Sequence, residues 1–149
     1  NSMVLSIITG VISLGFFIFF TYFFRIPNRI VIADENYIVA PADGKIVVIE
    51  PTMENEFLKE KRLQVSIFMS VFDVHANWFP IAGKVKHVSH QNGRYMAAYL
   101  PKSSTENERS TILIETKCKK TILVRQIAGA LARRIVTYAK EGQDCNINE

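Results

Sequence analysis

The stretch "LQVSIFMSVFDVHANWFP", Leu63 to Pro80, passes without a break from an apolar run into a cluster of polar residues. Side chains that alternate with a period of two are typical of a β-strand. In residues 63–72 one alternating set is apolar throughout and the other contains Phe68 and Phe72, so we expect a central strand that is largely covered on both faces. The polar residues that follow, from Asp73 to Trp78, then form either an ordinary loop or a site at the end of that strand.

Further strands are predicted on both sides of this stretch. "NYIVAPADGKIVVIE" has the pattern of a strand, a turn and a second strand, because Pro, Asp and Gly stand between two β-branched runs. "GKVKHVSHQ" and "RYMAAYL" also favour strands, whereas "GALARRIVTYAKEGQ" allows a short helix or a strand. The remaining strand predictions cover residues 46–49, 65–71, 111–115 and 122–127. Six or seven strands and at most one short helix predict an all-β domain, barrel- or sandwich-like.

The N-terminal segment has a different character. Residues 1–24 contain no charged side chain, and Val4 to Phe24 form an apolar run about 31 Å long as a helix, which matches a bilayer core. A cleaved signal peptide would need a positive charge before the run and small residues after it, and a buried core helix is the other alternative. We therefore expect one membrane helix.

Two arginines, Arg25 and Arg29, follow this helix. By the positive-inside rule they place the rest of the chain in the cytoplasm, beside anionic headgroups. The expected organisation is a membrane-embedded helix over residues 4–24, a juxtamembrane linker over 25–36 and a β-rich catalytic domain over 37–149.

Composition narrows the functional classes. The chain has 149 residues, a net charge of +4 and two cysteines, Cys118 and Cys145, whose spacing fits no zinc site. His87 and His90 are three apart and would face opposite sides of a strand, so we expect no metal. Phosphate-binding loops and dinucleotide fingerprints are absent from the sequence, and no nucleic acid partner is expected.

Two segments carry residues suited to catalysis. Asp43 lies in "PADG", where an aspartate usually caps its own turn, and His75 lies in "DVHANWFP", where a lone histidine is more often structural. Trp78 is either a core residue or a lipid-facing anchor. By spacing alone, each of these assignments stays open.

The order of the segments is more specific than any one of them. An apolar anchor with "FFRIPNR", then "APADGKI", "SIFMSVFDVHANWFPIAGKV", "NERS" and "RQIAGALARRI" resembles the phosphatidylserine decarboxylase family. The likeness covers Phe23 to Gln143 and is stronger to the short, membrane-anchored bacterial and archaeal branch. It implies a lyase of phospholipid biosynthesis in a bacterial or archaeal cytoplasmic membrane, with its domain on the cytoplasmic side.

The resemblance also implies how such an enzyme matures. A proenzyme (zymogen) cleaves itself at a serine preceded by glycine and yields a β chain and a separate α chain. The serine becomes a pyruvoyl group on the α chain, which serves as electron sink when the serine headgroup of the phospholipid loses carbon dioxide. This sequence contains no Gly-Ser pair, so we expect it to be most of the β chain, with the pyruvoyl residue outside it.

Site residues follow from matching positions. Asp43 and His75 match catalytic residues of the family, although a second histidine found three residues later in its longer branch is Trp78 here. His75 is therefore expected in self-cleavage, in decarboxylation or in both. Trp78 and Arg109 are expected at the substrate, and a homodimer is expected because family members are often dimeric. The alternative is a non-catalytic, membrane-tethered β-barrel binding module.

Overall fold

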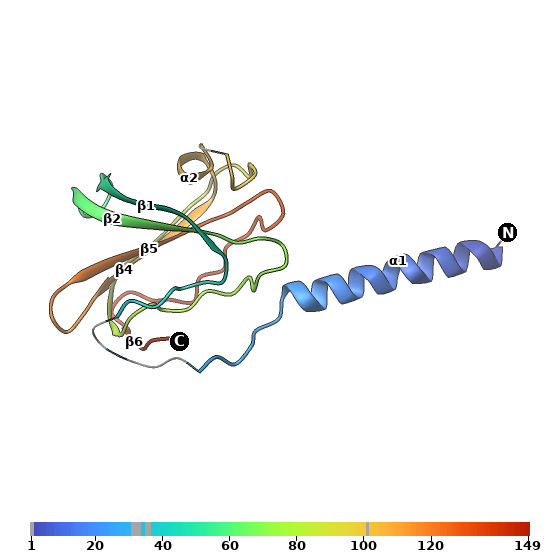
Figure 1. Ribbon diagram of the computed structural model, residues 1–149, viewed down its shortest axis with the longest axis horizontal. Coiled ribbons are helices and arrows are strands. Elements are labelled where there is room, and N and C mark those ends of the chain that lie inside the picture. The colour runs from blue at the N-terminus through green and yellow to red at the C-terminus, as the bar shows by residue number, and fades with distance from the viewer. Residues whose placement is uncertain (1, 31–33, 35–36, 101) are drawn as a thin grey trace. The chain divides into compact units, whose positions relative to one another are not determined.

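The computed structural model describes residues 2–30, 34, 37–100 and 102–149 (Figure 1). Among these residues one N-terminal helix, α1 (Ser2–Phe23), precedes six strands, which confirms a predominantly β fold with an apolar N-terminal helix. The part of the chain that follows α1 contains one short helical turn, α2 (Ser103–Glu106), among its described residues. The chain divides into two compact units, residues 1–28 with 42–77 and residues 29–41 with 78–149, which are described separately below.

Helix α1 is apolar along its whole length. Its mean hydropathy reaches 2.4, and the window that gives this value has none of its residues buried. It is the one helix among the described residues that is long and apolar enough to cross a membrane, a property compatible with membrane association. Only Phe23, at the end of the helix, is buried.

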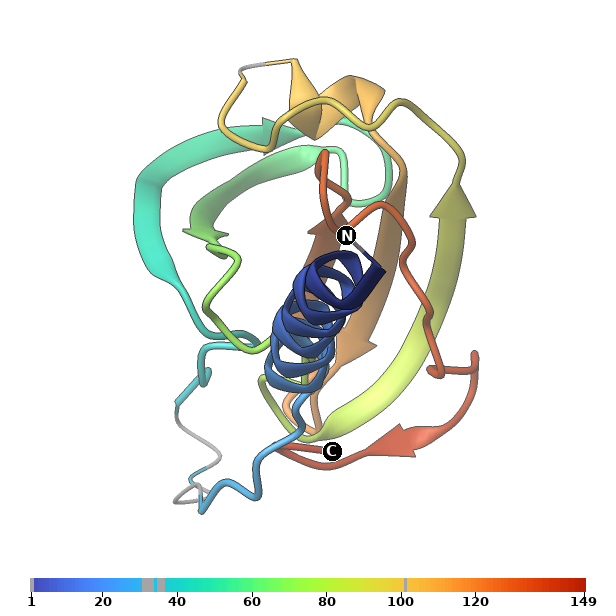
Figure 2. The ribbon, with the colours of Figure 1, turned by 90° about the vertical axis from the view of Figure 1, so that its right-hand side faces the viewer.

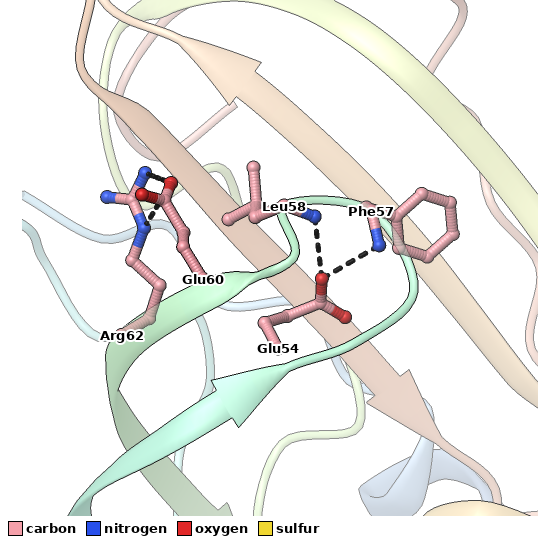
Figure 3. A network of polar contacts seen from close by, with 5 residues as sticks. All are labelled: Glu54, Phe57, Leu58, Glu60 and Arg62. Carbon is pink, nitrogen blue, oxygen red and sulfur yellow. Dashed lines mark hydrogen bonds and ion pairs between the residues drawn. The ribbon is translucent and has the colours of Figure 1, made fainter.

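The first unit also contains the antiparallel hairpin of β1 (Lys45–Glu54) and β2 (Glu60–Phe68). Its turn is closed by Glu54, whose Oε2 accepts the backbone N–H groups of Phe57 at 2.8 Å and Leu58 at 2.7 Å (Figure 3). Arg62 forms an ion pair with Glu60 at the start of β2 (Figure 3). The Glu54 turn closes the hairpin, whereas the Arg62–Glu60 ion pair lies within β2.

The strand predicted over residues 65–71 is correct in type but wrong in extent and surroundings. β2 ends at Phe68, because Asp73 Oδ2 accepts the Ser70 N–H at 2.7 Å and turns the chain. The strand is also not covered on both faces, since Leu63 is 67% and Val65 50% exposed. An apolar set on one face and two phenylalanines on the other therefore did not indicate a central strand here.

The second unit is built on a four-stranded antiparallel sheet in the order β5-β4-β3-β6, seen curving in Figure 2. Its strands are β3 (Gly83–Gln91), β4 (Arg109–Glu115), β5 (Thr121–Ile127) and β6 (Asp144–Cys145). The predictions over residues 83–91, 111–115 and 122–127 are confirmed. The core packs on one face of this sheet around Ile81, Val85, Ile112, Ile114 and Cys145.

Three predicted elements of this unit are irregular instead. The strand expected before the "PADG" turn is absent from its described residues, 37–40. "RYMAAYL" forms no strand, because both backbone groups of Met96 bond to the side chain of Asn107 rather than to a neighbouring strand. The segment over residues 128–140 forms neither helix nor strand, and Ile135 donates its N–H to the Glu108 carboxylate. After β5 this segment returns along β3 to β6 (Figure 2), where Gly142 donates to the Val85 carbonyl.

Candidate active site

Asp43 and His75 both lie at the open end of the β1–β2 hairpin. Lys45 pairs with Phe68 at this end, so Asp43 stands two residues before the last pair and His75 seven residues after it. Between them, Gly44 adopts φ 144°, and a Cβ there would lie 2.3 Å from the Phe68 carbonyl oxygen. Only glycine allows this close approach, which fixes the "PADG" bend against the end of β2.

A tight turn then brings the chain from β2 to the histidine. Asp73 donates its N–H to the Ser70 carbonyl at 3.0 Å, while its carboxylate accepts the Ser70 N–H. Val74, which is 2% exposed, anchors the turn by burial. The carboxylate of Asp73 is thus engaged within the turn, and its carbonyl is left to bond the histidine ring.

The imidazole of His75 is held on two sides. Its Nδ1 lies 3.0 Å from the carbonyl oxygen of Asp73, and its ring stacks on Phe23 with centroids 3.9 Å apart. A carbonyl only accepts hydrogen bonds, so Nδ1 carries the proton of this contact. In the neutral ring Nε2 then has the lone pair, and a half-buried base with a fixed plane is available for proton transfer.

Arg25 joins the end of α1 to the loop before His75. Its Nη1 donates to the Tyr22 carbonyl at 2.8 Å and its Nη2 to the Phe72 carbonyl at 2.9 Å. The guanidinium also lies over the Tyr22 ring, 3.7 Å from the centroid. These contacts attach the histidine loop to the helix end at a second point beside Phe23.

Trp78 and Arg29 meet in the second unit. The Arg29 guanidinium lies over the Trp78 ring, 4.7 Å from its centroid. The backbone N–H of Trp78 donates to the Pro41 carbonyl at 2.9 Å. Asn148 donates its side-chain N–H to the Arg29 carbonyl at 3.2 Å. The aromatic ring expected at the substrate is thus paired with one of the two juxtamembrane arginines.

Arg109 lies apart from these residues along the chain, as the first residue of β4. Its guanidinium donates to the Thr105 carbonyl and ties the strand to α2. Its expected role at the substrate therefore stays a prediction. No three His, Cys, Asp or Glu side chains among the described residues are grouped so that they could hold a metal ion.

Sequence reasoning missed the two contacts that orient His75. The Phe23 ring belongs to a segment whose composition indicates only lipid solubility, and nothing in "FFIFFTYFF" distinguishes it from its neighbours. The Asp73 carbonyl is a backbone atom and has no sequence signal.

Comparisons of the sequence with known proteins agree on one family. The sequence profile of the family described as phosphatidylserine decarboxylase matches residues 16–149. A phosphatidylserine decarboxylase proenzyme of Parabacteroides distasonis is 61% identical over 93% of this chain and 63% of its own length. Proenzymes of the same name from Porphyromonas gingivalis and Bacteroides thetaiotaomicron are 56% and 54% identical, over 99% and 95% of this chain.

The chain belongs to the phosphatidylserine decarboxylase family. It spans 63% of the length of the Parabacteroides relative and 68% of the Porphyromonas relative, so each relative contains a further segment outside the match.

Proposed function

We propose that this chain is the β-chain part of a phosphatidylserine decarboxylase proenzyme. The complete enzyme converts phosphatidylserine and a proton into phosphatidylethanolamine and carbon dioxide. The observation that carries the proposal is His75, oriented by the Asp73 carbonyl and by Phe23 at the end of an apolar helix. The partner is the pyruvoyl-bearing α chain, formed by self-cleavage from the segment that the relatives possess outside the match.

The residues at the open end of the hairpin fit a carbonyl prosthetic group. An imidazole with a fixed plane and a half-buried carboxylate, Asp43, belong to the same hairpin end, and this donor set suits proton transfers at a ketone. A pyruvoyl group, when present, supplies the electron sink for loss of the substrate carboxylate. Asp43 and His75 are the residues of this chain that would hold it.

His75 moves protons at Nε2. With its Nδ1 proton engaged by Asp73, the neutral ring can accept a proton from a serine hydroxyl during self-cleavage. The protonated ring can later return a proton to the substrate carbon that has lost carbon dioxide. We propose that the side chains of Asp43 and His75 are in contact in the mature enzyme. In that geometry the Asp43 carboxylate stabilises the positive charge of the protonated ring in either step.

Helix α1 explains how a lipid headgroup reaches this site. Its 22 residues give a length of about 33 Å, enough to span a bilayer core. His75 packs on its last turn, so the site lies where the helix would leave the membrane, at the depth of the headgroups. Arg25 and Arg29 follow directly and place that end on the cytoplasmic side.

The test is the fate of the complete precursor in a membrane. We expect two chains by intact mass, the smaller with a blocked N-terminus, and release of carbon dioxide from phosphatidylserine in mixed micelles. An uncut precursor that releases none would contradict the proposal and leave a non-catalytic, membrane-tethered β module.

A further inference from the structure

Two irregular loops of the second unit, over residues 94–100 and 130–138, have an unusual surface composition. They expose the apolar and aromatic side chains of Tyr95, Tyr99, Leu100, Leu131, Val136 and Tyr138. The same segments contain three arginines, Arg94, Arg133 and Arg134, and no acidic residue. We call residues 94–100 and 130–138 together the two-loop surface.

Two buried polar side chains bind these loops to each other. Asn107, 1% exposed, donates from Nδ2 to the Met96 carbonyl at 2.8 Å and to the Ala128 carbonyl at 2.7 Å. Its Oδ1 accepts the Met96 N–H at 3.0 Å. One amide therefore satisfies backbone groups in the first loop and at Ala128, two residues before the second loop, which compensates for sheet bonds that these residues lack.

Glu108 adds a charged connection next to it. One carboxylate oxygen accepts the Tyr95 hydroxyl and the other the Ile135 N–H, each at 3.0 Å. The side chain is 3% exposed, and His90 lies 3.6 Å away. Hydrogen bonds to an ionised group are stronger than neutral ones, so the loops are held in a fixed shape without packing their apolar tips inward.

The arginines lie close to this connection. Glu108 raises the pKa of the Tyr95 hydroxyl, and the positive charges of Arg134 and Arg133 offset part of this effect. Glu108 is buried, and its two carboxylate oxygens are engaged by Tyr95 and Ile135. The outward side combines exposed guanidinium groups with exposed tyrosine and aliphatic side chains.

From this composition and rigidity we infer that the two-loop surface docks on the headgroup region of an anionic phospholipid bilayer. Tyrosines with aliphatic side chains are the residues that partition into this region, and arginines supply the complementary charge to anionic lipids. The inference rests on the proposed membrane anchorage by α1, and it is independent of the decarboxylation chemistry. It assigns a second membrane contact to the unit that α1 does not belong to.

The experiment uses the whole chain, α1 included, in nanodiscs of phosphatidylcholine alone or mixed with phosphatidylglycerol. Phosphatidylglycerol is anionic but carries no serine, so substrate binding cannot produce the signal. We expect slower amide hydrogen exchange at residues 94–100 and 130–138 in the anionic nanodiscs, and loss of this protection at high salt. Amides within β3 and β4 should exchange equally in both.

Charge variants make the test specific. R133Q/R134Q should lower the docking equilibrium roughly 30-fold, at about fivefold per basic residue near an anionic surface, while R133K/R134K should retain it. The matched control is K119Q/K120Q, which removes the same charge from the turn between β4 and β5 and should change nothing.

Equal exchange in both lipids, or protection that survives in R133Q/R134Q, would overturn the inference. Protection in phosphatidylcholine that grows with protein concentration would also overturn it and indicate a second protein copy as the occupant. A precursor that docks but releases no carbon dioxide would refute the proposed function alone.

Discussion

The imidazole of His75 lies nearly parallel to the ring of Phe23, with centroids 3.9 Å apart and planes inclined by 22°. This stack joins the one buried residue of α1 to the histidine of the candidate site. A fixed imidazole plane matters because proton transfer depends on the direction of the Nε2 lone pair. The last turn of the helix therefore orients the imidazole of the candidate site.

His75→Ala in the complete precursor should lower self-cleavage or decarboxylation by about 10²–10⁴-fold, because a positioned acid–base group is lost. Gel separation of precursor and products measures the first step, and carbon dioxide release the second. His90→Ala is the control, since it removes a half-exposed histidine from β3. Unchanged cleavage and turnover in His75→Ala would remove His75 from the site.

Phe23→Leu should keep the apolar volume but remove the aromatic stack. Aromatic pairs contribute about 0.5–1.5 kcal/mol, so kcat should fall roughly threefold to tenfold while KM changes little. The matched control, Phe20→Leu, changes a ring on the same helix that is 52% exposed and should leave kcat unchanged. Equal effects of both variants would show that the stack does not orient the histidine.

Gly93→Ala should destabilise the second unit by about 1–3 kcal/mol, because its Cβ would lie 2.4 Å from the carbonyl carbon of Asn107 and 2.4 Å from the Glu106 oxygen. At Gly129 the nearest atom, Ala98 Cβ, is 3.7 Å away, so Gly129→Ala should be near neutral. Urea unfolding of the two variants in the same detergent compares them. A Gly93→Ala protein as stable as Gly129→Ala would contradict the close packing of this loop on Asn107.

Glu108 should make stability depend on pH. Burial raises the pKa of its carboxyl, but the N–H of Ile135, the Tyr95 hydroxyl and the charges of His90 and Arg134 outweigh it and hold the pKa below its ordinary value. A carboxyl whose pKa is lower in the folded state than in the unfolded state stabilises the fold. This stabilisation is fully present above the unfolded-state pKa of about 4.3 and is lost as the pH falls through the folded-state pKa. In urea titrations Glu108→Gln should flatten this acid-side loss of stability. An unchanged pH profile would show that the carboxylate is not held ionised.

The strands could be predicted from the sequence, and their grouping could not. Alternating β-branched residues located β3, β4 and β5, since that pattern depends only on local side-chain direction. The division into a hairpin and a separate four-stranded sheet depends on distant pairings that alternation does not encode. The loss of the expected strand near Met96 has the same origin, because Asn107, eleven residues later, takes over its backbone bonds.

The candidate site was predicted in part. Matching positions indicated Asp43 and His75, and the structure shows that they belong to the same hairpin end. The contacts that orient His75 come from the Asp73 carbonyl and from the Phe23 ring. Neither contact can be predicted from the types of residue in the sequence. Whether the two side chains meet remains a prediction for the mature, two-chain protein.

Arg25 connects the end of helix α1 to the loop that carries His75. The guanidinium bonds the last turn of α1 at Tyr22 and the loop at Phe72, three residues before His75. A helix of about 33 Å exceeds a hydrocarbon core of about 30 Å and compensates by tilting, more strongly in thinner membranes. The helix contacts the loop at two points, through Arg25 and through the Phe23 ring. A change in helix tilt should therefore also change the orientation of the imidazole. If the proposed activity and anchorage hold, we expect the turnover rate of the complete precursor to change with the hydrophobic thickness of the lipid, and therefore with acyl-chain length.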